Sequence, residues 1–295
     1  MPKLDLTWSN KILSIIKEVN SISATQKFYS FEINKLSVGK IPHPEITSKI
    51  APYLDSEFLV NHECHKISLD GGCSKISEKL NGIAEKLRED KPELIPGWRG
   101  EQYPILYPES IGSVERAAAD LIFGFEKYGS HLTIFKKKDD DFRILLAKRS
   151  KTKSKFPGYW DNSVAGGINY GMSPRECILK EAYEEAGIDD ENILQKIVAI
   201  GMTSNCYAKT CYMKETQFNY KLDVSEFENF EPKIIDGEVE LFKFCSVQEV
   251  LDLLVSGNFK PISAIVTIQF LVQKGILTME NTEKYIEIVK RLNSN

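Results

Sequence analysis

Three glutamates in one short segment have the residue type and spacing to do chemistry. Glu181, Glu184 and Glu185 stand at positions i, i+3 and i+4, so they project from one side of an α-helix. Three like charges so close repel one another, and such an arrangement usually implies a cation between them. Mg²⁺ or Mn²⁺, hard ions that prefer oxygen ligands, would fit best. A solvated acidic helix face is the simpler alternative.

The residues around these glutamates carry the signals of a helix with defined ends. Ser173 can cap the N-terminus, Pro174 suits the first helical position, and Glu176 completes a capping box. Gly187 can close the C-terminus. A glycine turn at residues 166–171 precedes the helix. A turn at this distance favours a metal-dependent phosphate site over a solvated face.

The run from Gly166 to residue 188 resembles the signature of the Nudix hydrolases. That signature is Gly, five residues, Glu, seven residues, then Arg-Glu-hydrophobic-x-Glu-Glu-x-Gly-hydrophobic. Gly166 falls at the first landmark, but Met172 replaces the first glutamate and Lys180 replaces the arginine. Lysine keeps the positive charge without the forked guanidinium, so we expect Lys180 to orient a glutamate rather than touch substrate. The three later glutamates survive, so the resemblance implies a catalytically competent site.

The resemblance also implies a ligand set for two or more Mg²⁺ (or Mn²⁺) ions. The three glutamates would hold them, and a backbone carbonyl near Gly166 would add a ligand. Bound divalent cations neutralise phosphate oxygens and generate hydroxide near neutral pH. Glu238 or Glu240 is expected to supply the remaining carboxylate or the water-activating base. Exposed strand charge is the alternative for both.

Basic and aromatic residues near the glycine turn are candidate substrate contacts. Arg149, Lys151 and Lys153 could clamp a diphosphate, since arginine gives bidentate phosphate contacts. A solvated basic loop is the alternative for each lysine. Tyr159 and Trp160 could form an aromatic wall against a ring, although tryptophan more often packs in a core.

A narrower resemblance, to a fungal and plant subgroup of Nudix proteins, covers the chain from about residue 90 to the C-terminus. It is carried by residues 96–103, 126–132, 148–153, 156–167, 236–242 and 258–261. This subgroup includes the Nudix domain that precedes thiamin pyrophosphokinase in some fungal fusion proteins. The resemblance implies hydrolysis of diphosphates of damaged thiamin, such as oxo- and oxythiamin diphosphate, to the monophosphate and phosphate.

Other functions stay open at this stage. The glutamate motif identifies a diphosphate and a metal rather than a leaving group, so ADP-ribose, NADH or coenzyme A are alternative substrates. Isopentenyl diphosphate isomerase would need a cysteine just before the glycine turn, and residues 163–165 offer none. A degenerate module that only binds a ligand is the non-enzyme alternative, suggested by Met172 and Lys180.

Composition limits the classes of partner. The chain has 38 Lys and Arg against 42 Asp and Glu, a formal charge of −4, which gives no general basic field for nucleic acid. No apolar run approaches the roughly 20 residues that span a bilayer, so no membrane partner is expected. The six cysteines form no Cys-x-x-Cys pair and are typical of reduced thiols. Residues 1–20 resemble neither a secretory signal nor a transit peptide, so we expect a cytoplasmic protein, with its oligomeric state open.

At 295 residues the chain is long enough for two compact units. We expect an α/β (α+β) protein: a small α/β domain over residues 1–110, a Nudix mixed-sheet α/β/α sandwich over 111–257, and C-terminal helices over 258–295. Trp98 and Arg99 are placed in a pocket between the units. Periodicity predicts helices at 7–20, 74–87, 113–123, 246–254 and twice within 261–292. It predicts strands at 28–36, 58–60, 131–135, 142–147, 197–202, 210–222 and 239–244, with a turn at 139–141.

Overall fold

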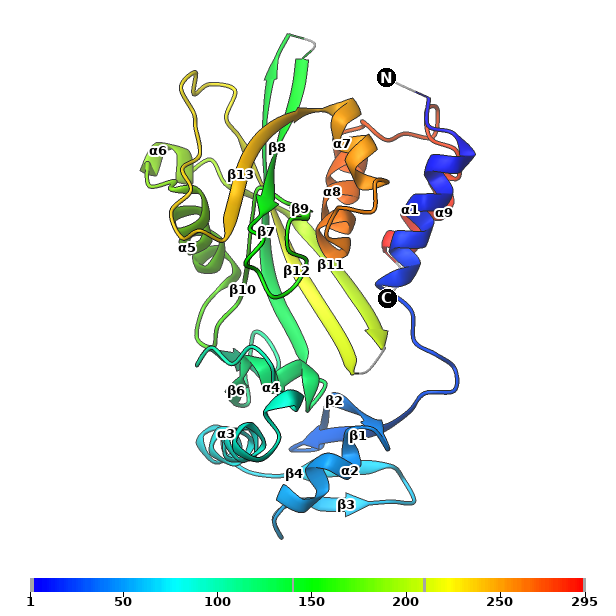
Figure 1. Cartoon of the computed structure of the whole chain (residues 1–295), viewed down its shortest axis with the longest axis vertical. Helices are drawn as coiled ribbons and strands as arrows, with labels where there is room; N and C mark the ends of the chain where they lie inside the picture. The colour runs from blue at the N-terminus through cyan, green and yellow to red at the C-terminus, as the bar shows by residue number, and fades with distance from the viewer. Residues whose placement is uncertain (1–2, 140, 209–210, 294–295) are drawn as a thin grey trace.

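The computed structural model describes residues 3–139, 141–208 and 211–293. A small unit built from the N-terminal part of the chain adjoins a larger unit formed around a mixed sheet (Figure 1). The predicted α/β class is confirmed. Asp140 of the predicted turn and Thr210 of a predicted strand lie outside the described residues.

The small unit contains a four-stranded sheet in the order β2-β1-β4-β3. Its strands are β1 (Lys27–Ile33), β2 (Leu36–His43), β3 (Leu59–Asn61) and β4 (Lys66–Leu69). The strand predicted at 28–36 is confirmed as far as Ile33, but its end is wrong, because Asn34 and Lys35 both take positive φ and turn the chain into a hairpin. Short helices α2 (Thr47–Ile50) and η1 (Ala51–Tyr53) follow β2.

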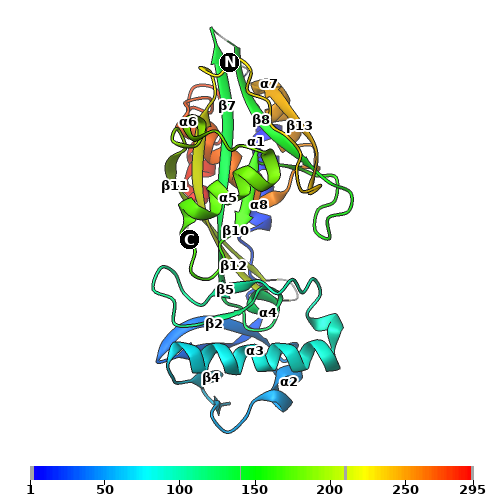
Figure 2. The same ribbon diagram turned by 90° about the vertical axis from the view of Figure 1, so that its left-hand side faces the viewer.

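Helix α3 (Cys73–Asp90) covers this sheet (Figure 2). Its buried residues Ile76, Leu80, Ile83 and Leu87 recur at helical spacing and make one apolar stripe. The same hydrophobic core continues along the chain to Phe125. It therefore takes in the segment η2 (Pro92–Leu94), β5 (Gln102–Pro104), β6 (Ser113–Glu115) and α4 (Arg116–Leu121). The predicted boundary at residue 110 stays a prediction.

The larger sheet has the order β11-β12-β7-β8-β13, with β10 added to β7 and β9 added to β8. Its strands are β7 (Glu126–Lys138), β8 (Asp141–Arg149), β9 (Trp160–Asp161), β10 (Val164–Gly167), β11 (Val198–Ala208), β12 (Tyr212–Asp223) and β13 (Val239–Ser246). Strand β7 runs parallel to β12 and pairs on its other side with β10 near its start and β8 near its end. The sheet therefore splits along β7: β10 is its neighbour at residues 129–132 and β8 is its neighbour at residues 135–138.

Helices cover both faces of this sheet (Figure 1). One side carries α5 (Pro174–Ala186) and α6 (Glu191–Leu194), and the other carries α7 (Val247–Leu254), α8 (Pro261–Gln273), α9 (Tyr285–Leu292) and α1 (Leu6–Glu18). The sequence placed the first helix with the small unit, but α1 packs against α8 and α9. Its apolar residues join their core, and the Trp8 indole donates to the Leu251 carbonyl at 3.1 Å.

None of the helices in the described ranges is long and apolar enough to cross a lipid bilayer.

Candidate active site

Helix α5 positions the three glutamates. Its predicted ends are confirmed: Ser173 and Glu176 form a capping box, Pro174 occupies the first turn, and Gly187 ends the helix with φ of 63°. These caps fix where the helix starts and therefore which side chains face the sheet. The glutamates at 181, 184 and 185 all line one cavity.

The three glutamates differ in burial. Glu185 is 9% exposed, and its carboxylate accepts from the Ala165 backbone N–H at 3.0 Å. Burial raises the pKa of Glu185 to about 8, and the charge of Glu181 adds to this effect. Burial also raises the pKa of Glu181. Lys180 forms ion pairs with Glu181, at 3.4 Å, and with Glu184. Lys180 thus contacts two of the glutamates, and its role in orienting them stays a prediction.

The glycine turn is packed too closely to admit side chains. A Cβ atom at Gly166 would overlap the carboxyl group of Glu181, and one at Gly167 would overlap the Tyr103 hydroxyl. The Glu181 and Tyr103 side chains would therefore have to move to make room for a side chain at these two positions. Met172, where the signature has a glutamate, packs against the apolar cluster of Tyr128, Ile168 and Cys177.

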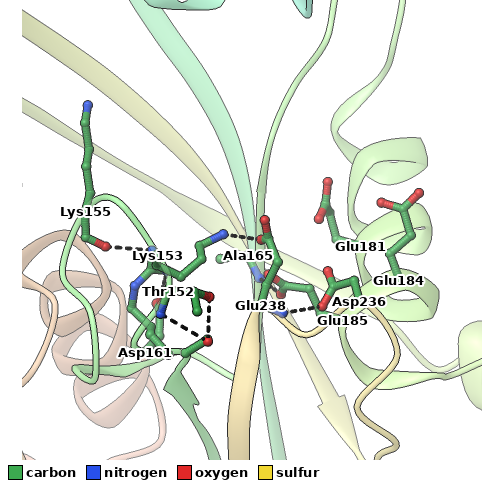
Figure 3. A network of polar contacts seen from close by, with 12 residues as sticks. Thr152, Lys153, Lys155, Asp161, Ala165, Glu181, Glu184, Glu185, Asp236 and Glu238 are labelled. Carbon is green, nitrogen blue, oxygen red and sulfur yellow. Dashed lines mark hydrogen bonds and ion pairs between the residues drawn. The ribbon is translucent and has the colours of Figure 1, made fainter. Parts of the chain in front are cut away.

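A cavity of about 410 Å³ lies between the small unit and the larger sheet. The small unit contributes Arg99, Tyr103 and Arg116, and the opened sheet contributes Gly129 and His131. Figure 3 shows Glu185 close to Ala165, with Glu238 approaching from the start of β13. Lys153 pairs with Glu238, and an Arg99 nitrogen lies 3.8 Å from the same carboxylate. The cavity therefore brings carboxylates and cations from four parts of the chain together.

Most of the predicted site residues reach this cavity. The residues that line it are Arg99, Arg149, Lys153, Gly166, Lys180, Glu181, Glu184, Glu185 and Glu238. Trp98 lines an adjoining hollow, beside Gly237, and Arg88 lies over its ring at 4.6 Å. Lys151 is exposed on the loop after β8 and is not among the described residues that line either hollow.

The two residues of the predicted aromatic wall lie outside the cavity lining, and their contact with substrate stays a prediction. Trp160 packs, half-buried, against the core cluster that includes residues of α8, and Tyr159 contacts Phe156 in a T-shaped arrangement. Successive side chains of a strand point to opposite faces, so in β9 it is Asp161 that turns toward Arg149. Neither aromatic residue is among the described residues that line the cavity.

Two further placements differ from the sequence analysis. Glu240 is exposed, because the pairing of β13 with β8 shifts between Val239 and Leu241 and leaves it in a bulge. Arg149 lines the cavity, but its guanidinium donates to Asp161 at 2.9 Å and to the carbonyls of Phe156 and Lys155. It thus fastens the loop after β8 rather than presenting a free diphosphate clamp.

Several buried polar residues were missed by the sequence analysis. Lys127 lies between Asp120 at 2.7 Å and Glu215 at 2.9 Å. Burial alone would lower its pKa, but the two carboxylates hold it well above the ordinary value. His131 and Asp161 belong to a second buried network. Their partners are distant in sequence, so the only available signal was the alternation of polar residues in β7.

The carboxylates suit a hard cation by chemical type. As they stand in the described part of the chain, no three His, Cys, Asp or Glu side chains are arranged to hold a metal ion. The Lys180 and Lys153 ammonium groups instead neutralise Glu181, Glu184 and Glu238. The raised pKa of Glu185 reports a carboxyl group that an adjacent cation would favour in its ionised form.

Two family models match the chain, and together they cover most of it. The NUDIX domain matches residues 129–265, and a Domain of unknown function (DUF4743) matches residues 11–127. An uncharacterized protein of Saccharomyces cerevisiae is 35% identical over 211 residues, which are 67% of this chain and 61% of that protein. Nudix hydrolase 20, chloroplastic, of Arabidopsis thaliana is 32% identical over 279 residues, which are 90% of this chain and 73% of that protein.

The chain belongs to the Nudix hydrolase family. The predicted enzyme class, hydrolases that act on diphosphate bonds, is thereby confirmed, and Nudix hydrolases generally use divalent cations. Among solved structures, the NUDIX domain of Shewanella oneidensis NrtR complexed with ADP ribose matches 52% of this chain and 91% of its own, at 14% identity and a TM-score of 0.40. The Arabidopsis relative is chloroplastic by name, and the cytoplasmic location of this Nudix chain stays a prediction.

Proposed function

We propose that this Nudix chain is a Mg²⁺- or Mn²⁺-dependent pyrophosphohydrolase that converts diphosphates of damaged thiamin, such as oxo- and oxythiamin diphosphate, to the monophosphate and phosphate. One observation carries the diphosphate chemistry: Glu181, Glu185 and Glu238 line a single cavity beside the glycine turn. The stretches that resemble the damaged-thiamin subgroup support the substrate, and several of them line the same cavity.

The α5 glutamates have the role of cation ligands in this proposal. Glu181, Glu184 and Glu185 would hold the cation, and the Gly166 carbonyl would add a ligand; all four residues line the cavity. When bound, the cation neutralises the diphosphate oxygens and lowers the pKa of water. Lys180 keeps Glu181 and Glu184 oriented through its two ion pairs.

Glu238 is suited to orient or deprotonate the attacking water, or to act as a further cation ligand. Burial would raise the pKa of Glu238, but the hydrogen bond and charge of Lys153 hold it below its ordinary value. The carboxylate is therefore ionised near neutral pH and can accept a proton or orient a water molecule. Lys153 and Arg99 place positive charge at the same edge of the cavity, where they would attract the substrate's phosphates.

The test is a comparison of substrates under identical conditions. Phosphate release is measured with Mg²⁺ and oxythiamin diphosphate, oxothiamin diphosphate or intact thiamin diphosphate. Hydrolysis of ADP-ribose and NADH is followed in parallel by chromatography of the nucleotide products. We expect the highest kcat/KM with a damaged thiamin diphosphate. Preferred cleavage of ADP-ribose or NADH would refute the substrate assignment, and no cleavage of any compound would refute the enzyme.

A further inference from the structure

Polar residues of β7 and β12 form one side of the cavity. They are separate from the α5 glutamates. The two strands are parallel, with Gly129 opposite Gln217 and His131 opposite Asn219. Alternate residues of a strand share a face, so Glu215 and Gln217 point to the same side of the sheet as His131. All three side chains line the cavity. We call Glu215, Gln217 and His131, with the gap at Gly129, the cavity floor.

Hydrogen bonds fix the tautomer of His131. The Thr267 hydroxyl donates to the Ser263 carbonyl at 2.8 Å, so its oxygen is free to accept from the Asn162 amide nitrogen at 3.0 Å. The amide oxygen of Asn162 therefore faces Nδ1 of His131, at 2.8 Å. An amide oxygen only accepts, so Nδ1 carries the proton and Nε2 carries a lone pair.

The groups that hold this imidazole are themselves anchored to a buried carboxylate. The Asn162 backbone N–H donates to Asp161 at 2.8 Å, the Ser263 hydroxyl donates to the same carboxylate, and Arg149 and Lys260 form ion pairs with it. Burial lowers the pKa of His131 to about 4, and the charge of Lys260 contributes. Within the described ranges, Nδ1 with Asn162 is the side-chain hydrogen bond that His131 makes, which leaves Nε2 as an acceptor.

The rest of the floor also presents acceptors. A Cβ atom at Gly129 would overlap the Gln217 amide oxygen, so that oxygen lies over the space that glycine leaves open. The Gln217 amide nitrogen faces the Glu215 carboxylate at 3.5 Å. The other Glu215 oxygen is bound by Lys127 at 2.9 Å. The floor thus offers an imidazole nitrogen, an amide oxygen and a carboxylate oxygen, all of which accept hydrogen bonds.

We propose that the cavity floor binds the non-phosphate part of the substrate and selects a nitrogen heterocycle that carries N–H donors. Phosphate oxygens are themselves acceptors, so they do not pair with a neutral Nε2 or with the Gln217 oxygen. A ring with N–H groups matches the acceptors. A ring without them leaves buried acceptors unpaired, which polar sites reject strongly. The assignment rests on the proposed diphosphate hydrolysis, which orients the phosphates toward α5 and the ring toward β7 and β12.

The first test needs no substrate. Nitrogen-15 NMR of the ligand-free protein at pH 7 should show His131 protonated at Nδ1 and unprotonated at Nε2. Thr267→Val removes the acceptor of the Asn162 amide, so it should lift this tautomer preference. A wild-type His131 protonated at Nε2 would overturn the proposal whatever the enzyme hydrolyses. This test can therefore refute the proposed role of the cavity floor independently of the proposed hydrolase function.

The second test uses a matched pair of variants. Gln217→Met keeps the length of the side chain without the acceptor oxygen, and Gln217→Glu keeps an acceptor. For oxythiamin diphosphate we expect KM to rise about 5- to 100-fold in Gln217→Met, with a small change in kcat and partial or full recovery in Gln217→Glu. Inhibition by inorganic pyrophosphate should be the same in wild type and Gln217→Met, whose side chains carry the same charge. Equal weakening of pyrophosphate and substrate would place Gln217 at the phosphates and refute the proposal.

If oxythiamin diphosphate is not hydrolysed, calorimetry compares ADP-ribose, whose adenine carries an amino donor, with pyrophosphate. Weaker binding of ADP-ribose alone to Gln217→Met would support the floor. Equal affinities for both ligands in wild type and variant would overturn it.

Discussion

Replacing Asp161 with asparagine should destabilise the protein by about 3 kcal/mol near pH 7. Asp161 is 5% exposed and accepts from Arg149 at 2.9 Å, from Lys260 at 3.0 Å and from the Ser263 hydroxyl. Asparagine keeps the size but leaves two cations without a counter-charge. Breaking a buried pair costs about 3–5 kcal/mol. The lower end applies because the Arg149 and Lys260 side chains keep 14% and 22% of their surface exposed.

The cost should depend on pH. Burial alone would raise the pKa of Asp161, but Lys260 and Arg149 hold it well below its ordinary value. A carboxyl with a depressed folded pKa adds stability above its unfolded pKa of about 3.9 and loses it as the pH falls through the folded pKa. The difference between wild type and Asp161→Asn should therefore be full at pH 7 and shrink below about pH 4.

Urea and thermal unfolding measure this effect. At roughly 2.1 cal/mol/K of unfolding entropy per residue, about 3 kcal/mol corresponds to a fall of about 5 °C in Tm. Glu226→Gln is the control, because Glu226 pairs with Lys196 on the surface at 3.4 Å and should leave Tm unchanged. If Asp161→Asn lowers the free energy of unfolding by less than about 1 kcal/mol, or by the same amount at pH 3 and pH 7, the stabilising role of the buried ion pairs of Asp161 is refuted.

Three further outcomes are expected. Gly166→Ala should displace the Glu181 carboxyl and lower phosphate release about 100-fold at nearly unchanged Tm, and an unchanged kcat would show that the position of Glu181 is immaterial. Trp160→Phe should lower Tm and leave KM unchanged, because Trp160 is half-buried against the core beside α8; a raised KM at normal stability would support a contact between Trp160 and the substrate. EDTA should abolish phosphate release and Mg²⁺ should restore it, whereas release that persists in chelator would contradict the cation-dependent mechanism.

Local signals were enough to predict the helix of the site. The capping box at Ser173, the proline at the first turn and the glycine at 187 act within a few residues of α5, and the structure contains all of them. The glycines before the helix were recognised by spacing, and the overlaps at Gly166 and Gly167 give the physical reason for them. Alternation located β8 and the middle of β7 for the same local reason.

Tertiary packing decided what the sequence could not. Whether Trp160 or Asp161 points toward Arg149 depends on how β9 pairs with β8, and alternation alone does not select the face. The amphipathic pattern of the first helix suits packing against either unit. Its apolar side packs with α8 and α9, which the pattern alone does not predict. Lys127 finds Glu215 at a distance of 88 positions along the chain, through the parallel pairing of β7 and β12. Such pairs leave no pattern in a single sequence.

The most direct test of the central claim is the initial rate of phosphate release from oxythiamin diphosphate with Mg²⁺, compared between wild type and Glu185→Gln. Glutamine keeps the size of Glu185 but cannot ionise, and Glu226→Gln controls for the loss of a surface carboxylate. We predict release by wild type and by the control, and a fall of at least about 100-fold in Glu185→Gln. Equal rates in wild type and Glu185→Gln would contradict the assignment of the α5 carboxylates.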